Sequence, residues 1–256
     1  MRFSRPTLLL LTLLYSSSAF SQQPPQRDPQ AVIVLQHAFA AMGATVPSDS
    51  VATGNVTLFA GSKTENGTIR ILTRGLEQSA EQIQTPDANR SIVYSQGLAN
   101  RVDSSGTTPF TLELAASSQT PCFPFALIAR ALNNPDYAFQ YLGLEALGSA
   151  QAHHLRLWNT FSSSSKLQRL AEFTAKNLWI DAVSGLPLKL ALDHRNGGGA
   201  ESRIPLAVFY SDYRNVGGVL YPFRVDKSLN GTPWAKITIT QVAFNTGLTD
   251  NDFPIQ

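Results

Sequence analysis

The chain has 256 residues, with 20 Lys and Arg, 18 Asp and Glu, and a formal net charge of +2. This near balance argues against nucleic acid and against electrostatic attachment to an anionic membrane, because both partners select for concentrated positive charge. The one cysteine, Cys122, excludes an internal disulfide, so we expect the fold to be stabilised by packing alone.

The N-terminus is typical of a secretory signal. Arg2 and Arg5 form its positive start, and residues 7–15 form an apolar run that is too short to span a bilayer. Small residues follow and predict cleavage before Gln22. We therefore expect residues 1–21 to be a signal peptide, with an uncleaved anchor as the alternative, and the mature protein to be exported, soluble and without net charge.

The first helix follows a polar lead. Residues 22–27 contain two prolines and no large apolar side chain, so we expect them to be disordered. Asp28 is a typical N-cap, Pro29 suits the first helical position, and Gly43 suits the end of a helix. The apolar stripe between them, at helical spacing, consists of Val32, Leu35, Phe39 and Met42.

Short segments with strand character come next. Apolar and polar residues alternate in several of them, which is typical of strands with one buried face. The predicted strands are residues 54–60, 67–73, 79–85 and 91–96. Asn66-Gly67 predicts a hairpin turn between the first two, because Asn and Gly tolerate the positive φ that such turns need.

A second helix interrupts the strands. Residues 125–132 carry apolar side chains at helical spacing, and Asn133-Asn134-Pro135 predicts the end of the helix. We expect this helix to pack on the concave face of the sheet. Two further strands are predicted at residues 137–146 and 152–160. Residues 166–172 are compatible with either a helical turn or the approach to a strand.

The last eighty residues alternate between strands and turns. The predicted strands are residues 177–181, 188–192, 204–213, 219–228 and 235–244. The turn signals include Gly185-Leu186-Pro187 and Asn230-Gly231, and the gaps are too short for crossover helices. The predicted fold is α+β, mainly β: one curled antiparallel sheet of ten or eleven strands, a half-open β-barrel, with two or three helices over its concave face.

Three segments resemble the LolA/LolB-like superfamily of periplasmic lipoprotein carriers. Residues 179–187 (Trp-Ile-Asp, then Gly-Leu-Pro) are similar to its strand-turn-strand signature, residues 211–223 to the block that follows, and residues 242–253 to its closing strand and tail. The resemblance implies a single domain over residues 28–256 in the periplasm. It also implies an incomplete barrel that holds a lipid or the acyl chain of a lipidated protein.

The expected ligand cavity lies between the helices and the sheet. Helical spacing and strand alternation suggest that it is lined by Leu35, Phe39, Phe125, Leu127, Ile128, Val208 and Tyr210. Residues 204–213 are apolar on both faces, which predicts a core on one side and a cavity or helix on the other. Ordinary packing between two layers is the alternative.

We find no catalytic or metal-binding constellation in the sequence. His153 and His154 are adjacent in a predicted strand and therefore point to opposite faces, and Cys122 has no base nearby in the sequence. We expect no enzyme activity, no metal and no cofactor. The leading hypothesis is a monomeric hydrophobic-ligand carrier with a possible transient membrane-protein partner. An RseB-like regulatory protein that binds a membrane partner is the alternative.

Overall fold

The computed structural model describes residues 26–119, 121–195 and 203–255. The first strands are β1 (Asp49–Ala60), β2 (Lys63–Arg74), β3 (Gln78–Gln84), β4 (Asn89–Ser95), β5 (Leu98–Asp103) and β6 (Gly106–Pro109). The later strands are β7 (Tyr137–Leu147), β8 (Ala150–Asn159), β9 (Lys176–Asp181), β10 (Pro187–Arg195), β11 (Arg203–Val216), β12 (Val219–Leu229) and β13 (Thr232–Phe244). The helices are α1 (Pro29–Ala41), α2 (Leu112–Ser118), α3 (Phe125–Asn133) and the short 3-10 helices η1 (Gln168–Thr174) and η2 (Asp250–Asp252).

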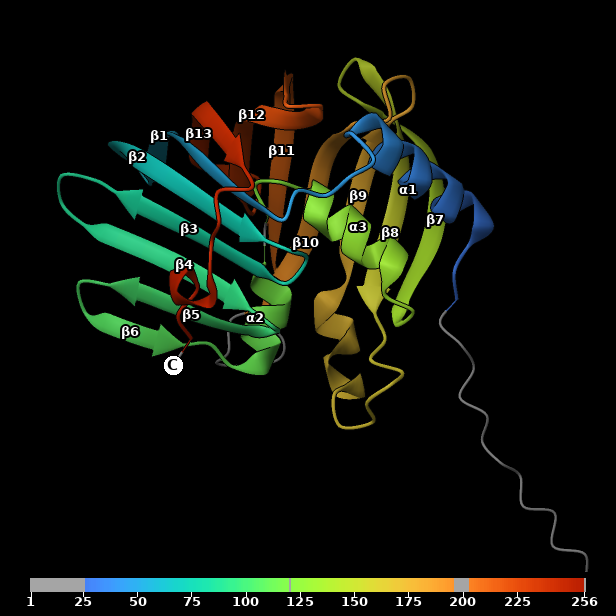
Figure 1. Cartoon of the computed structure of the whole chain (residues 1–256), viewed down its shortest axis with the longest axis horizontal. Coiled ribbons are helices and arrows are strands. Elements are labelled where there is room, and N and C mark those ends of the chain that lie inside the picture. Colours follow the sequence, from blue (N-terminus) through green and yellow to red (C-terminus); the bar gives the residue numbers. More distant parts are fainter. Residues whose placement is uncertain (1–25, 120, 196–202, 256) are drawn as a thin grey trace, which may run out of the picture.

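In the described residues, all 13 strands belong to one antiparallel sheet (Figure 1). Their order in space is β6-β5-β4-β3-β2-β1-β13-β12-β11-β10-β9-β8-β7. The pairing of β1 with β13 therefore lies in the middle, while β6 and β7 form the two edges. The sheet curls without closing, which leaves an opening between the β4–β6 side and the β7–β9 side.

The predicted fold class is confirmed, and several elements begin and end where the sequence indicates. The Asp28 side chain accepts a hydrogen bond from Gln30 N at 2.9 Å and caps α1, with Pro29 at its first position. The β12–β13 hairpin turns at Asn230 and Gly231, whose φ angles of 49° and 75° are those of a type I′ turn.

The predicted turn at Asn66-Gly67 is wrong. These residues lie inside β2, and the hairpin instead turns at Gly61 and Ser62, where Gly61 has φ +62°. Asn66 faces solvent beside Thr57 and accepts a hydrogen bond from its hydroxyl at 2.8 Å. A polar residue on the outer face of a long strand has the same local sequence signal as a turn, and the hydrogen bonding of the whole hairpin decides between them.

The region between residues 98 and 118 holds three elements that the sequence did not indicate. Strands β5 and β6 raise the strand number above the ten or eleven predicted, and α2 follows them. Strand β6 is a short, polar run at the sheet edge and ends in Pro109, a residue that edge strands tolerate. The undecided segment at 166–172 is helical and forms η1.

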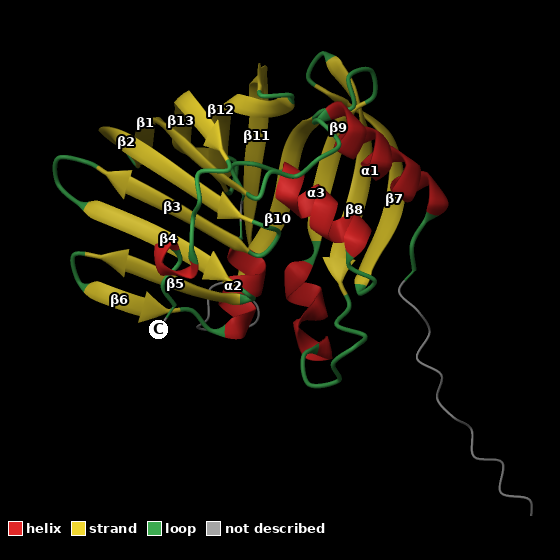
Figure 2. Cartoon of the chain, viewed as in Figure 1, coloured by secondary structure: helices red, strands yellow, loops and turns green. Residues whose placement is uncertain are grey.

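Helices α1 and α3 contact each other and β7, and they cover the concave face of the sheet (Figure 2). In β11, Leu206, Val208 and Tyr210 point into this core. The other face of the strand does not meet a helix: Phe209 is 38% exposed on the outer face, with the Lys189 Nζ 5.5 Å from its ring centroid.

The predicted signal peptide and residues 22–25 of the predicted disordered lead lie outside the described residues. The end of that lead is ordered, contrary to expectation. Gln26 and Arg27 run beside β7: Phe139 N donates to Gln26 O at 2.9 Å, and Arg27 Nη2 donates to Leu132 O at 2.8 Å. Across the described chain, every helix falls short of the length and apolar character that a membrane crossing requires.

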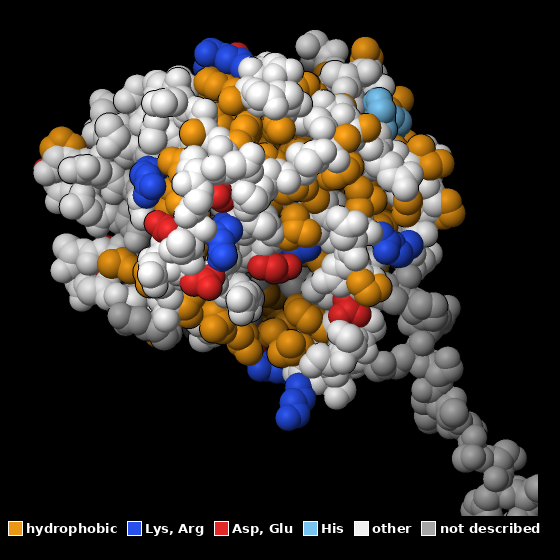
Figure 3. Space-filling view, in the orientation of Figure 1, with side chains coloured by type: hydrophobic (Ala, Val, Ile, Leu, Met, Phe, Trp, Pro, Cys, Tyr) orange, Lys and Arg blue, Asp and Glu red, His pale blue; other side chains and the backbone are white. Residues whose placement is uncertain are grey.

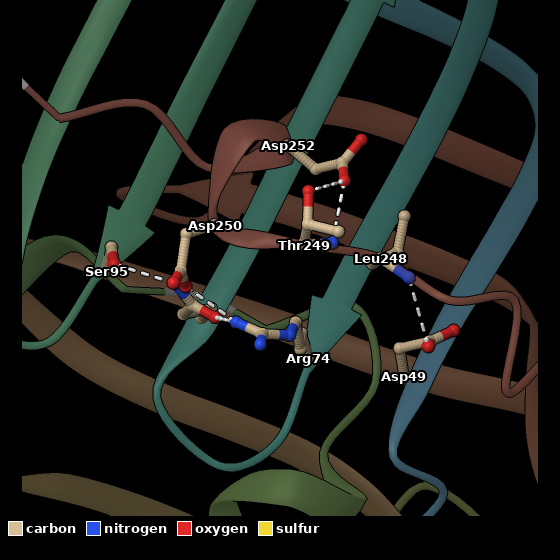
Figure 4. A network of polar contacts seen from close by, with 8 residues as sticks. Asp49, Arg74, Ser95, Leu248, Thr249, Asp250 and Asp252 are labelled. Carbon is tan, nitrogen blue, oxygen red and sulfur yellow. Dashed lines mark hydrogen bonds and ion pairs between the residues drawn. The ribbon is translucent and has the colours of Figure 1, made fainter.

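The C-terminal tail crosses the outer face of β1 to β4 (Figure 4). Its apolar contacts are separate from the core that the helices cover. The buried ring of Phe253 packs there against Leu72, Ala80 and Val93. Asp49 fixes the start of the tail by accepting hydrogen bonds from the backbone of residues 246–248 at 2.6 to 3.2 Å. Burial opposes the charge of Asp49, but these bonds and that from the Thr246 hydroxyl outweigh it and lower its pKa.

We expect Asp49→Asn to destabilise the fold by about 1–3 kcal/mol, because an amide cannot accept all of these hydrogen bonds. The contribution of Asp49 is full above its ordinary pKa of 3.8 and is lost as the pH falls through the lower folded pKa. Urea titrations at neutral and acid pH measure both effects. Asp250→Asn, which breaks the exposed Asp250–Arg74 ion pair, is the control with a smaller effect. Equal loss in both variants would contradict this account of the tail.

Candidate functional site

The residues predicted to line a ligand cavity lie in the interior core. All are buried except Phe39, which is partly buried, with its ring centroid 5.2 Å from that of Phe125. The interior next to them is occupied by aromatic side chains, including Phe123 stacked on Tyr221 at 4.4 Å. None of the predicted residues lines the cleft described next, and their role in ligand binding stays a prediction.

The cleft lies at the opening of the sheet and encloses about 300 Å³. One wall comes from α2 and the β4–β5 turn, and the other from the ends of α3 and β8 together with η1. Figure 3 shows hydrophobic side chains gathered around a hollow in the lower part of the view, over α2. This volume is at the lower end of the roughly 300–1,000 Å³ typical of small-molecule sites.

Two local features hold the walls in place. Thr111 caps α2 by accepting a hydrogen bond from Leu114 N at 3.2 Å. On the other wall, the Asp136 carboxylate accepts hydrogen bonds from Ser162 and Ser163 and so anchors the loop that leads to η1. Burial opposes the charge of Asp136, but these bonds outweigh it and lower its pKa. An exposed Arg169–Glu113 ion pair joins η1 to α2.

The walls of the cleft are largely apolar. They include Leu98, Leu112, Ala115, Phe161, Leu167 and Leu170. Leu98 is 46% exposed, and Leu112, Phe161 and Leu167 are half-buried. Apolar side chains that remain exposed in a concave site gain free energy when a ligand covers them.

Lys176 lies at the inner end of the cleft and is only 4% exposed. Its Nζ donates two long hydrogen bonds to backbone carbonyls, at 3.4 Å to Ala116 and 3.5 Å to Thr174. Within the described chain, no carboxylate forms an ion pair with it. Burial, together with the positive charge of Arg130, lowers the pKa of Lys176 to about 7. The ammonium therefore gains and loses its proton near neutral pH.

Arg130 is the second cation of the cleft. Its guanidinium donates to Glu77 Oε2 at 3.1 Å and to Gln119 Oε1 at 3.2 Å. Its Nε is buried and has no hydrogen-bond partner among the described residues. Glu77 is half-exposed, so the carboxylate that balances Arg130 lies at the outer side of the cleft.

A second buried polar cluster connects the two sides of the sheet. Lys227, on β12, donates to both carboxylate oxygens of Glu81, on β3, at 2.7 and 2.6 Å. Burial alone would lower the pKa of Lys227, but the ion pair outweighs it and raises the pKa. The Cys122 thiol donates to Glu81 at 3.2 Å, and burial and the nearby carboxylate raise its pKa. Cys122 is therefore a protonated thiol, as expected for a structural cysteine.

The histidine pair is separated, as the strand alternation predicts. His154 stacks on Trp179 at 4.2 Å and lies 2.7 Å from Glu145, whereas His153 lies 3.0 Å from the Tyr141 hydroxyl. In the part of the chain that the structure describes, no group of three or more His, Cys, Asp and Glu could hold a metal.

Comparison with known proteins shows the fold. No protein-family model and no curated protein matches the chain. A solved domain from Vibrio parahaemolyticus, named for outer membrane lipoprotein sorting, matches with TM-score 0.59 and 15% identity over 88% of this chain and 96% of that one. A LolA superfamily protein from Nitrosomonas europaea matches with TM-score 0.57 and 19% identity over 88% and 97%. The chain has the LolA-like fold. A DUF1329 family protein from Desulfovibrio piger is similar at TM-score 0.57 and 10% identity, over 88% and 97%.

Sequence reasoning missed the residues that build the cleft. Lys176 lies just before the predicted strand 177–181, a common place for a solvated lysine, and α2 was not predicted from the sequence. The one available signal was the serine-rich turn at residues 162–165, which the Asp136 carboxylate anchors. The cleft arises where the two sides of an unclosed sheet approach each other. No local sequence pattern specifies the distance between these two sides.

We expect Lys176→Met to stabilise the protein at pH 7 and below. An unfolded lysine titrates near 10.5 and folded Lys176 near 7, so burying the ammonium costs up to about 5 kcal/mol at low pH. The unfolded chain binds more protons between pH 7 and 10.5, so wild-type stability rises with pH in this range. The free energy of unfolding of Lys176→Met, measured by denaturation, should not show this rise with pH. Lys63→Met, at an exposed lysine, is the control. If the free energy of unfolding depended on pH in the same way in wild type and in Lys176→Met, the proposed cost of burying Lys176 would be refuted.

We expect Glu81→Gln to destabilise the protein by about 3–5 kcal/mol, because the buried Lys227 ammonium loses the carboxylate that forms its ion pair. Adding Lys227→Met to that variant removes the buried ammonium and should restore much of the stability. Thermal denaturation of the single and double variants provides the measurement. A double variant no more stable than Glu81→Gln would show that the lost stability does not come from the broken Glu81–Lys227 ion pair.

Proposed function

We propose that this protein is an exported binding protein that holds the acyl chain of a lipid or lipidated protein in the cleft at the opening of its sheet. The observation that carries the proposal is the group of half-exposed apolar side chains, Leu98 among them, on the walls of a concave site. The proposed location is the periplasm, and the proposed activity is binding and transport without catalysis.

The energetics favour an apolar ligand. Transfer of one methylene from water to an apolar site is worth about 0.8 kcal/mol, so several methylenes in the cleft offer a useful affinity even after the costs of ordering the chain. The rigid frame of the cleft, with α2 capped and the η1 loop anchored by Asp136, reduces the cost of ordering the protein.

The fold is compatible with this role. Fold alone does not determine function, since one architecture hosts unrelated activities. The Vibrio parahaemolyticus domain is nevertheless named for lipoprotein sorting, and this supports a carrier role for a chain of the same fold. In the carriers that the sequence resembles, the acyl chain lies in the barrel interior. Here the interior is filled by Phe123, Phe125 and their neighbours, and we assign the ligand to the opening instead.

Native mass spectrometry of the protein purified from an exported source, followed by organic extraction, tests the proposal. A bound species that contains an acyl chain would support it and identify the ligand class. A protein of bare mass that also fails to bind added dodecanol would contradict it. A stable complex with a membrane protein in that second case would favour the RseB-like alternative.

The walls of the cleft are tested with matched leucines. We expect Leu98→Gln to weaken dodecanol binding about five- to tenfold, because the ligand loses an apolar contact worth about 1 kcal/mol. Leu144→Gln is the control, since Leu144 is 54% exposed on β7 and does not line the cleft. Isothermal titration calorimetry measures both affinities. Equal affinities for the two variants would place the apolar ligand elsewhere.

A further inference from the structure

The inner end of the cleft combines a buried cation with apolar walls. Lys176 is nearly inaccessible to solvent, and its ammonium donates only two long hydrogen bonds, both to backbone carbonyls. Arg130 lines the same cleft, and its Nε is buried and without a hydrogen-bond partner among the described residues. Buried ammonium and guanidinium groups are usually paired, since an unpaired charge is costly to remove from water. Two incompletely satisfied cationic donors at the end of an apolar cleft point to an anionic ligand group.

The other titratable groups of the cleft do not neutralise Lys176. Glu77, just before β3, is engaged by Arg130. Tyr94 on β4 and Tyr137 on β7 have pKa values raised by burial, so both are neutral near pH 7. At the rim, Glu113 on α2 and Arg169 on η1 form an ion pair, so their charges cancel. A protonated Lys176 therefore leaves the cleft with one uncompensated positive charge.

We propose that the cleft selects a single-chain acidic lipid, with its acid group beside Lys176 and the Arg130 Nε and its hydrocarbon chain along Leu98, Leu112 and Leu167. This inference rests on the proposed function and narrows it to one ligand class. The enclosed volume of about 300 Å³ suits one chain rather than several. The apolar walls favour an anion with a hydrocarbon chain over a free small anion, because only the chain would cover them.

Proton uptake is a consequence of this pairing. Free Lys176 is about half protonated at pH 7, and a bound carboxylate favours its charged form. Binding of the acid above pH 7 should therefore take up close to one proton. The affinity for the acid should fall about tenfold between pH 7 and pH 8.5, while the affinity for a neutral chain should not change.

Calorimetry of the mature protein with dodecanoate, dodecanol and acetate tests the proposal. We expect dodecanoate to bind about 10- to 100-fold more tightly than dodecanol at pH 7, and acetate not to bind measurably. Titrations in buffers of different ionisation enthalpy give the proton uptake. Lys176→Met should remove both the acid preference and the proton uptake but keep dodecanol binding. Lys63→Met, which removes an exposed charge on β2, should leave all of these unchanged.

Each outcome has a distinct meaning. Equal affinities for dodecanoate and dodecanol would overturn the acid preference and leave the proposed function standing. An acid preference that persists in Lys176→Met, with unchanged proton uptake, would overturn the assignment to Lys176. Tight acetate binding would show a small-anion site in place of a lipid site. Failure of both twelve-carbon probes to bind would overturn the proposed function itself. The acid–alcohol comparison on the wild-type protein needs no variant, so the proposal is testable even if Lys176→Met misfolds.

Discussion

The pairing of β1 with β13 is the interaction on which the rest of the architecture depends. It joins β2 to β6 on one side with β7 to β12 on the other, and without it the chain would form two separate sheets. The register shifts between Thr53 and Gly54, where a Cβ on Gly54 would come within 2.2 Å of Thr238 O. Glycine at this position lets the two backbones approach closely and lets the sheet bend. The buried Glu81–Lys227 pair adds a second link between the two sides.

The cleft is a consequence of this arrangement. A sheet of 13 strands curls but its edges do not meet, so its concave face needs a cover. Helices α1 and α3 cover this face on the side of β7, while α2 and η1 lie on either side of the opening and contact each other. The space between them remains partly exposed, because no further element of the described chain fills it. The candidate binding site is thus the place where the sheet is left unclosed, and the aromatic core behind it is packed.

Lys227 and Lys176 are both buried, but their surroundings shift their pKa values in opposite directions. Lys227 is paired with Glu81 by two short hydrogen bonds, and its charge is retained. Lys176 has only backbone carbonyls nearby and the positive charge of Arg130, and its pKa falls to about 7. A group whose burial is compensated stabilises the fold. A group whose burial is uncompensated destabilises it, and such groups gather at functional sites, where a ligand supplies the missing partner.

The amino-acid sequence was sufficient to predict the fold class, the antiparallel order of the last strands and the first helix. These depend on local signals: the Asp28 cap, the spacing of apolar residues and the Asn230-Gly231 turn. Local signals also account for the error at Asn66-Gly67, because this pair has the composition of a turn although it lies inside β2, where Asn66 is on the outer face. Three properties became evident only from the three-dimensional structure: where the sheet stays open, which side chains fill the interior, and which buried lysine has no ion-pair partner in the described chain. These properties depend on distances between residues far apart in the chain, such as Lys176 and Arg130, and no spacing along the sequence specifies them.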